Sequence, residues 1–232
     1  RVCIVNEANL CVSLQQNIKK VDNLEIDSKI IVSEICKIMI SNHYKINNID
    51  VHKADGLAIL RFMKYIKENH NKVYMDEYKL TEILEDYRRM DKRFYEVSFE
   101  TIAGWNSNGA IVHYEPTKDN YKVIEGDGML LLDSGGQYMG GTTDITRTYS
   151  LGPVTDEMKY YYTIVLKSHI DIALCKFLKG STGINIDSIA RMPFWTRGLD
   201  FKHGTGHGIG YMLNVHEGPQ SIRYNKVNPL PM

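Results

Sequence analysis

Two aspartates flank a glycine-bearing turn in the segment LLLDSGGQYMGGTTDITRT, residues 130–148. β-Forming residues on both sides of the turn predict an antiparallel β-hairpin. In a hairpin with a two-residue turn, directly paired residues differ by an odd number. Asp133 and Asp144 differ by eleven, which centres the turn between Tyr138 and Met139 and predicts that the two carboxylates face each other. Like charges placed so close repel unless a cation lies between them, so the pair is a candidate metal site; two solvated turn aspartates are the alternative.

A second motif, HGTGHGIGYMLNVHEGP, covers residues 203–219. His203 and His207 have the four-residue spacing of a helical zinc pair, but each glycine of the motif costs a helix roughly 1 kcal/mol relative to alanine. We therefore expect an extended, closely packed backbone here. Together with His216, the histidines suggest one imidazole ligand and other imidazoles that carry protons or donate to a tetrahedral intermediate. For each histidine alone, an ordinary hydrogen-bonded role is the alternative.

Helical and strand patterns occupy different parts of the chain. Apolar residues recur at helical spacing over residues 28–71, which predicts two or three amphipathic helices. A further helix is predicted from Thr81 to about Lys92, with Thr81 as its cap. From Phe94 the period changes to that of strands, and helix returns over residues 157–179. The order favours an α+β domain.

Composition limits the partners and the compartment. Lys plus Arg and Asp plus Glu both total 28, so no broad field attracts a nucleic acid or an anionic membrane. Apolar runs stop well short of the roughly 20 residues that a membrane-spanning helix needs. The cysteines form neither a CxxC pair nor a dense disulfide framework, which favours reduced thiols and a cytoplasmic location. They are Cys3, Cys11, Cys36 and Cys175.

The two motifs, together with NGAIVHYEP at residues 108–116, resemble three successive signatures of the aminopeptidase P family. The resemblance runs from about Asp55 to Pro219 and places the chain in the creatinase and methionine aminopeptidase superfamily. It implies a pita-bread fold, in which a curved antiparallel sheet flanked by helices holds two metal ions. Prolidase and methionine aminopeptidase are similar but less close. The implied activity is hydrolysis of the bond between an amino-terminal residue and a following proline by a metal-bound hydroxide.

The resemblance also assigns roles to six residues. It implies that Asp133, Asp144 and His207 are metal ligands, with Asp144 bridging the ions. It implies that His216, His203 and His113 are catalytic, and that His113 and His216 bind substrate. An oxygen-rich site with one imidazole suits manganese, with zinc or cobalt as alternatives.

The chain also departs from the family pattern. The family uses two further glutamates as ligands, one of them the general base, and neither is present; Glu217 matches neither position. We therefore expect a fold that is incomplete at the carboxyl terminus and a polypeptide that is inactive alone. We interpret residues 1–16 as the tail of a preceding non-catalytic domain, 17–27 as a linker and 28–232 as the truncated metallopeptidase catalytic domain. A homodimer is implied for the full-length protein. A catalytically inactive pita-bread module that binds peptides or proteins is the rival hypothesis.

Overall fold

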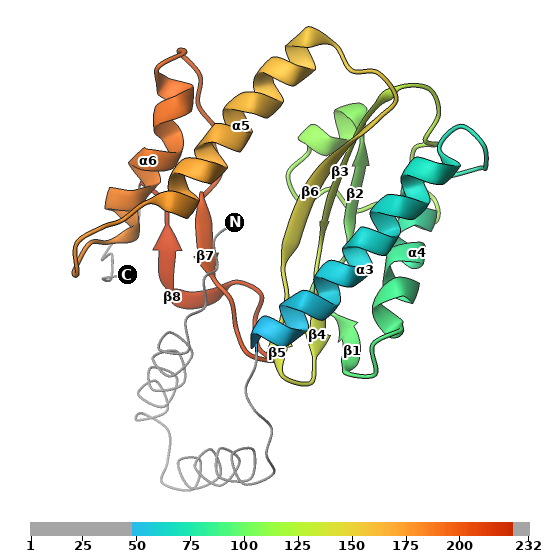
Figure 1. The fold of residues 1–232 in the computed structure, drawn as a ribbon, viewed down its shortest axis with the longest axis horizontal. Helices are drawn as coiled ribbons and strands as arrows, with labels where there is room; N and C mark the ends of the chain where they lie inside the picture. Colours follow the sequence, from blue (N-terminus) through green and yellow to red (C-terminus); the bar gives the residue numbers. More distant parts are fainter. Residues whose placement is uncertain (1–47, 225–232) are drawn as a thin grey trace, which may run out of the picture.

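The computed structural model describes residues 48–224 (Figure 1). Its helices are α3 (Asn48–Asn69), α4 (Glu77–Arg89), the 3₁₀ helix η1 (Asn106–Ala110), α5 (Asp156–Leu174) and α6 (Gly183–Trp195). Its strands are β1 (Phe94–Val97), β2 (Ile102–Trp105), β3 (Gly128–Ser134), β4 (Gly136–Tyr138), β5 (Gly141–Thr142), β6 (Ile145–Leu151), β7 (Gly206–Gly208) and β8 (Glu217–Ile222). Helices and antiparallel strands together confirm the predicted α+β class. The segments 1–16 and 17–27, and any helix within 28–47, lie outside the described residues.

Helices α3 and α4 pack together against the sheet formed by β2, β3 and β6 (Figure 1). Their apolar faces share one core with the inward side chains of the strands. That core contains Ile59, Phe62, Ile66, Met75, Leu80, Leu84, Ala103, Trp105, Ile124, Leu130, Leu132, Tyr149 and Leu151. The two helices therefore cover one face of this sheet and leave its other face free of α3 and α4.

The predicted amino-terminal cap of α4 was wrong by five residues. Asp76, not Thr81, is the cap, and its carboxylate accepts a hydrogen bond of 2.6 Å from the Lys79 backbone amide. Thr81 lies inside the helix and its hydroxyl donates back to the Tyr78 carbonyl. Aspartate before a glutamate is as good a start signal as threonine, so the sequence offered two caps of similar strength.

Strand β3 alternates strictly between buried and half-buried residues. Leu130 and Leu132 are fully buried in the core, whereas Leu131 and Asp133 are half-buried and alternate with them. Because successive side chains of a strand point to opposite faces, Asp133 belongs to the face away from α3 and α4.

The hairpin is present, but its predicted register was wrong. Asp133 pairs with Thr146, not with Asp144. Strands β4 and β5 join a second sheet with β1 and close the hairpin at Met139 and Gly140, one residue later than predicted. Gly140 has φ +115°, a conformation that glycine adopts at little cost, which explains where the turn forms. The two aspartates are thus offset by two positions along the hairpin.

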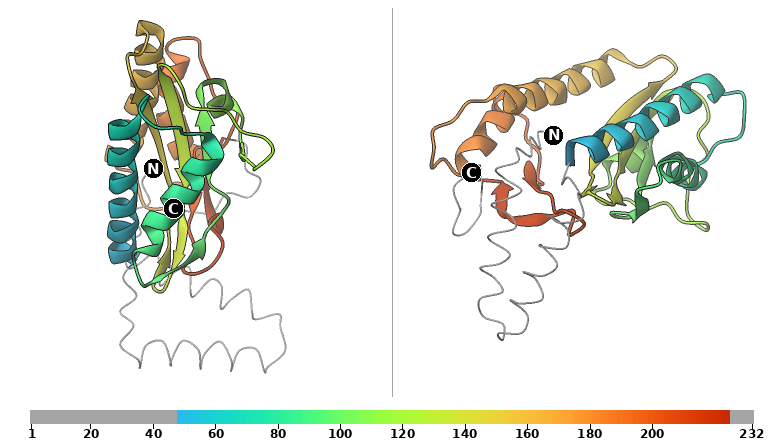
Figure 2. Two further views of the ribbon diagram at one scale, coloured as in Figure 1. Left: turned by 90° about the vertical axis from the view of Figure 1, so that its right-hand side faces the viewer. Right: turned by 60° about the horizontal axis from the view of Figure 1, so that its bottom comes forward.

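The carboxyl-terminal half pairs α5 with α6 and places β8 against α6, with β7 and β8 forming a two-stranded hairpin (Figure 2). The helix predicted at 157–179 is present as α5, but it ends at Leu174, five residues earlier than predicted. Helix α6 was missed. Its start carries a cap signal, because the Thr182 amide donates to the Asn185 side chain, but Pro193 within the segment counts against a helix.

None of the helices in residues 48–224 is long and apolar enough to cross a membrane. Cys175 is a free thiol, as expected, and the other three cysteines precede the described residues.

Candidate metal centre

Three side chains converge where the link from β5 to β6 meets the β7–β8 hairpin. The ligand atoms of Asp144, His207 and His216 all lie within 4.8 Å of one another. His207 Nε2 is 3.4 Å from Asp144 Oδ2, and the Asp144 side chain is only 4% exposed. The rings of His207 and His216 meet edge to face, with centroids 4.1 Å apart. Within residues 48–224, the two motifs predicted to form one site therefore do meet.

The geometry of His207 fits a metal ligand. Its Nδ1 lies 2.8 Å from the Gly208 carbonyl oxygen, which accepts a hydrogen bond only if Nδ1 carries the proton. Nε2 is then left as the basic nitrogen and faces Asp144. Ligand atoms about 2.1 Å from one metal ion lie about 3.0–3.4 Å apart at octahedral to tetrahedral angles. The 3.4 Å separation of Nε2 and Oδ2 is within this range.

Asp133 lies outside this three-residue group. Its Oδ1 accepts a hydrogen bond of 2.5 Å from the Thr146 hydroxyl, across the β3–β6 pair. Asp144 precedes Thr146 by two residues, so the two aspartates are diagonal neighbours, not direct partners. Diagonal neighbours in a regular sheet are about 7–8 Å apart at Cα and come within reach only through longer side chains or a shared ion. The role of Asp133 as a ligand stays a prediction.

His203 and His113 also lie outside the group. His203 is exposed, stacks on Phe201 with ring centroids 4.9 Å apart, and directs Nδ1 to the Gly204 carbonyl at 2.8 Å. His113 is exposed in the turn after η1 and has φ +57°. Their predicted catalytic roles remain predictions.

The glycine-rich motif is extended, as predicted, and glycine is required at one position in particular. A Cβ on Gly208 would lie 2.4 Å from the Glu217 carbonyl oxygen on the neighbouring strand. Gly208 pairs with Glu217 after an irregularity in the β7–β8 register that follows His207. The close approach of the two backbones places the His207 ring beside His216.

A buried ion pair holds the aspartate hairpin against the helices. Asp55 of α3 and Arg88 of α4 are fully buried, with Nε 2.6 Å from Oδ1. The Asp55 carboxylate also accepts hydrogen bonds from Tyr138 at 2.9 Å and Thr143 at 2.7 Å. Burial, and then the charge of Asp55, raise the pKa of Tyr138, so the phenol stays neutral and donates. Thr143 directly precedes Asp144, so the Asp55–Arg88 pair helps to fix the backbone that carries the Asp144 carboxylate.

A second buried carboxylate, Glu77, organises the loop that carries His113. It accepts hydrogen bonds from the Trp105 amide at 2.6 Å, the Tyr114 hydroxyl at 2.6 Å and the Lys122 amide at 2.7 Å. The Trp105 amide lies at the start of the loop, the Lys122 amide lies towards its end, and Tyr114 directly follows His113. One carboxylate therefore closes the loop between β2 and β3.

Sequence reasoning missed these buried charges, although a signal was present. Asp55 lies four residues after Val51 and four before Ile59 on the buried face of α3, and Arg88 follows Leu84 at the same spacing on α4. Opposite charges on two apolar helix faces indicate a buried ion pair, because charged residues are almost never fully buried unless paired.

Solved structures of several enzymes are similar to this fold. An X-prolyl aminopeptidase from Caenorhabditis elegans, described as a cytosolic enzyme with a di-nuclear active site, matches with a TM-score of 0.74 and 34% identity. The match covers 80% of this chain and 30% of that one. A prolidase from Thermococcus sibiricus matches with a TM-score of 0.65 and 29% identity, over 77% of this chain and 47% of that one. The fold is that of these enzymes, which confirms the predicted pita-bread class.

Comparison with curated sequences finds relatives that are named as Xaa-Pro aminopeptidases. Xaa-Pro aminopeptidase 1 of Dictyostelium discoideum is 39% identical over 225 residues, 94% of this chain and 34% of its own length. A protein of Laccaria bicolor named "Probable Xaa-Pro aminopeptidase P" is 46% identical over 173 residues, 74% of this chain and 27% of its own length. The chain thus spans about a quarter to a third of these relatives. A sequence profile of metallopeptidase family M24 matches residues 49–231, and the chain belongs to this family.

Proposed function

We propose that the chain forms part of a metal-dependent Xaa-Pro aminopeptidase, which hydrolyses the bond between an amino-terminal residue and a following proline. The observation that carries the proposal is the convergence of Asp144, His207 and His216 on ligand atoms within 4.8 Å of one another. The preference for proline rests on the names of the relatives at 39% and 46% identity.

Each residue of the site has a distinct task in this proposal. Asp144 and His207 would hold a divalent ion, with Asp133 as a further carboxylate ligand. Divalent ions bound there would activate water and polarise the scissile carbonyl. His216 would donate a hydrogen bond or a proton to the substrate, and its exposed position beside His207 supports this role. His203 and His113 are proposed to be catalytic as well, and His113 to bind the substrate together with His216.

Three further properties belong to this proposal. Manganese is the favoured ion, because carboxylate oxygens outnumber imidazole in the proposed ligand set. A cytoplasmic location follows the cytosolic description of the Caenorhabditis elegans neighbour. The homodimer is proposed from the family resemblance.

The test is release of the first residue from peptides in the presence of Mn²⁺. Two proteins are compared: the 232-residue chain, and a chimaera in which it replaces the matching segment of the Dictyostelium relative. We expect the chimaera to cleave Xaa-Pro-Yaa tripeptides at least about a hundredfold faster than Xaa-Ala-Yaa, a discrimination that a shaped pocket provides. The chain alone should show negligible activity, because the two glutamate ligands that the family resemblance implies are not in its sequence.

The unmodified relative is the positive control for the assay. If the chimaera cleaved Xaa-Pro dipeptides faster than tripeptides, the enzyme would be a prolidase. Binding of the tripeptide with no release of its first residue, while the relative remains active, would contradict the proposal and support the binding module.

A further inference from the structure

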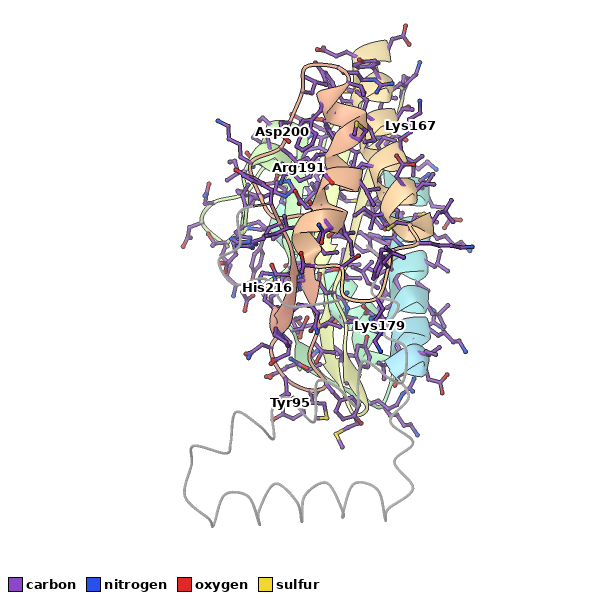
Figure 3. The ribbon with its side chains drawn as sticks, turned by 90° about the vertical axis from the view of Figure 1, so that its left-hand side faces the viewer. Tyr95, Lys167, Lys179, Arg191, Asp200 and His216 are labelled. Atoms are coloured by element: carbon purple, nitrogen blue, oxygen red, sulfur yellow. The ribbon has the colours of Figure 1, made fainter. Side chains whose placement is uncertain are left out.

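A single buried guanidinium connects helix α6 to the segment that leads into the histidine motif. Arg191 is fully buried, and its Nε donates to Asp187 on α6 at 2.7 Å. Its Nη1 donates to the Asp200 carboxylate at 2.7 Å and to the Phe201 carbonyl at 2.5 Å. Its Nη2 donates to the carbonyl of His203 at 3.0 Å. Figure 3 labels Arg191 and Asp200 next to α6, on the same side of the molecule as His216.

Asp187, which pairs with this guanidinium, also contacts the chain close to His207, the proposed metal ligand. The second oxygen of Asp187 accepts a hydrogen bond of 2.6 Å from the Thr205 hydroxyl. Thr205 also donates its backbone amide to Ile222 of β8 at 2.9 Å, and it precedes His207 by two residues. Arg191 and Asp187 thus act as one unit that contacts the chain from residue 200 to residue 205.

This segment has no regular secondary structure to fix it, although Phe201 also packs on Phe194 of α6. Residues 196–205, between the end of α6 and the start of β7, form no helix or strand. The Arg191 guanidinium also stacks on the Phe201 ring, 4.0 Å from its centroid. Because a guanidinium directs its donors along a rigid planar fork, it sets the relative positions of several acceptors, which a flexible ammonium cannot do.

We propose that Arg191 is a positioning residue, which fixes residues 200–207 and thereby sets the His203 carbonyl and the His207 imidazole in place. The part of this inference that concerns His207 as a ligand rests on the proposed function. The part that concerns the backbone does not, because it follows from contacts to the His203 carbonyl and to Thr205 alone.

The experiment compares Arg191→Lys with the parent in two measurements. Hydrogen exchange is measured on the 232-residue chain, where we expect amides of residues 201–207 to exchange at least about tenfold faster, with β3 unchanged. Mn²⁺ affinity is measured on the chimaera, where we expect a loss of about tenfold, the lower range for residues that orient metal ligands. Arg89→Lys is the control, since it makes the same substitution in an exposed ion pair with Glu85 on α4 and should leave exchange at 201–207 unchanged.

Each outcome decides a separate point. Unchanged exchange at 201–207 in Arg191→Lys, or an equal effect of Arg89→Lys, would overturn the proposal. Faster exchange with unchanged Mn²⁺ affinity would overturn the link to His207. If Arg191→Lys does not fold, Thr205→Val removes only one hydroxyl and should produce a smaller change at the same amides. Because neither measurement uses a peptide, failure of the aminopeptidase assay leaves the result intact.

Discussion

Asp144→Asn should lower the affinity of the chimaera for Mn²⁺ by more than about a hundredfold. Replacing a residue that only orients a metal ligand typically lowers metal affinity 10- to 100-fold. We expect a larger loss here, because Asp144 is proposed to contact the ions directly. The change keeps the size of the side chain, which is only 4% exposed, but removes the charge that faces His207 at 3.4 Å. Isothermal titration with Mn²⁺ measures the effect.

The control for this prediction is Asp171→Asn, which removes the same charge from an exposed position on α5. It should leave the titration unchanged. An Asp144→Asn protein that folds and binds Mn²⁺ as tightly as the parent would show that the ions are held elsewhere.

Asp55→Ala should lower the free energy of unfolding of the chain by about 3–5 kcal/mol, the usual effect of removing one partner of a buried ion pair. The change leaves the Arg88 guanidinium fully buried with no carboxylate beside it. It also removes the acceptor for Tyr138 and Thr143, so the hairpin before Asp144 loses two hydrogen bonds. Urea unfolding followed by circular dichroism measures the loss.

Glu68→Ala is the matched control, because Glu68 is also on α3 and pairs with Lys64, but both side chains are largely exposed. Exposed pairs contribute little, so we expect almost no change. Adding Arg88→Met to Asp55→Ala should recover part of the loss, because it removes the unpaired charge. A single mutant as stable as the parent would contradict the role assigned to the pair.

The sequence predicted those parts of the fold that depend on local pattern. The hairpin around Gly140, the helix α5 and the extended backbone at His207 each follow from residues close in the chain. The exact register did not, because β3 passes into β4 of another sheet and the turn moves to the positive-φ glycine. Helix α6 was missed because Pro193 outweighed the cap at its start.

The prediction of the site had the same limit. Histidines and aspartates in short motifs could be named as candidates, and the structure brings Asp144, His207 and His216 together from two hairpins. The residues that hold these motifs in place were not named: the spacing of Asp55 and Arg88 indicated a buried pair, but their contacts to the motifs, like those of Arg191, arise only in the folded chain. Arg191 reaches a carbonyl twelve residues away, and Asp55 meets a threonine 88 residues away.

The position of bound manganese tests the central claim most directly. Crystals of the chimaera grown with Mn²⁺ would locate the ions by their anomalous scattering. We expect one ion bonded to both the Asp144 carboxylate and His207 Nε2 at about 2.0–2.3 Å, close to the distances of comparable first-row metal sites. Manganese bound elsewhere, with neither side chain within about 4 Å of an ion, would contradict the account.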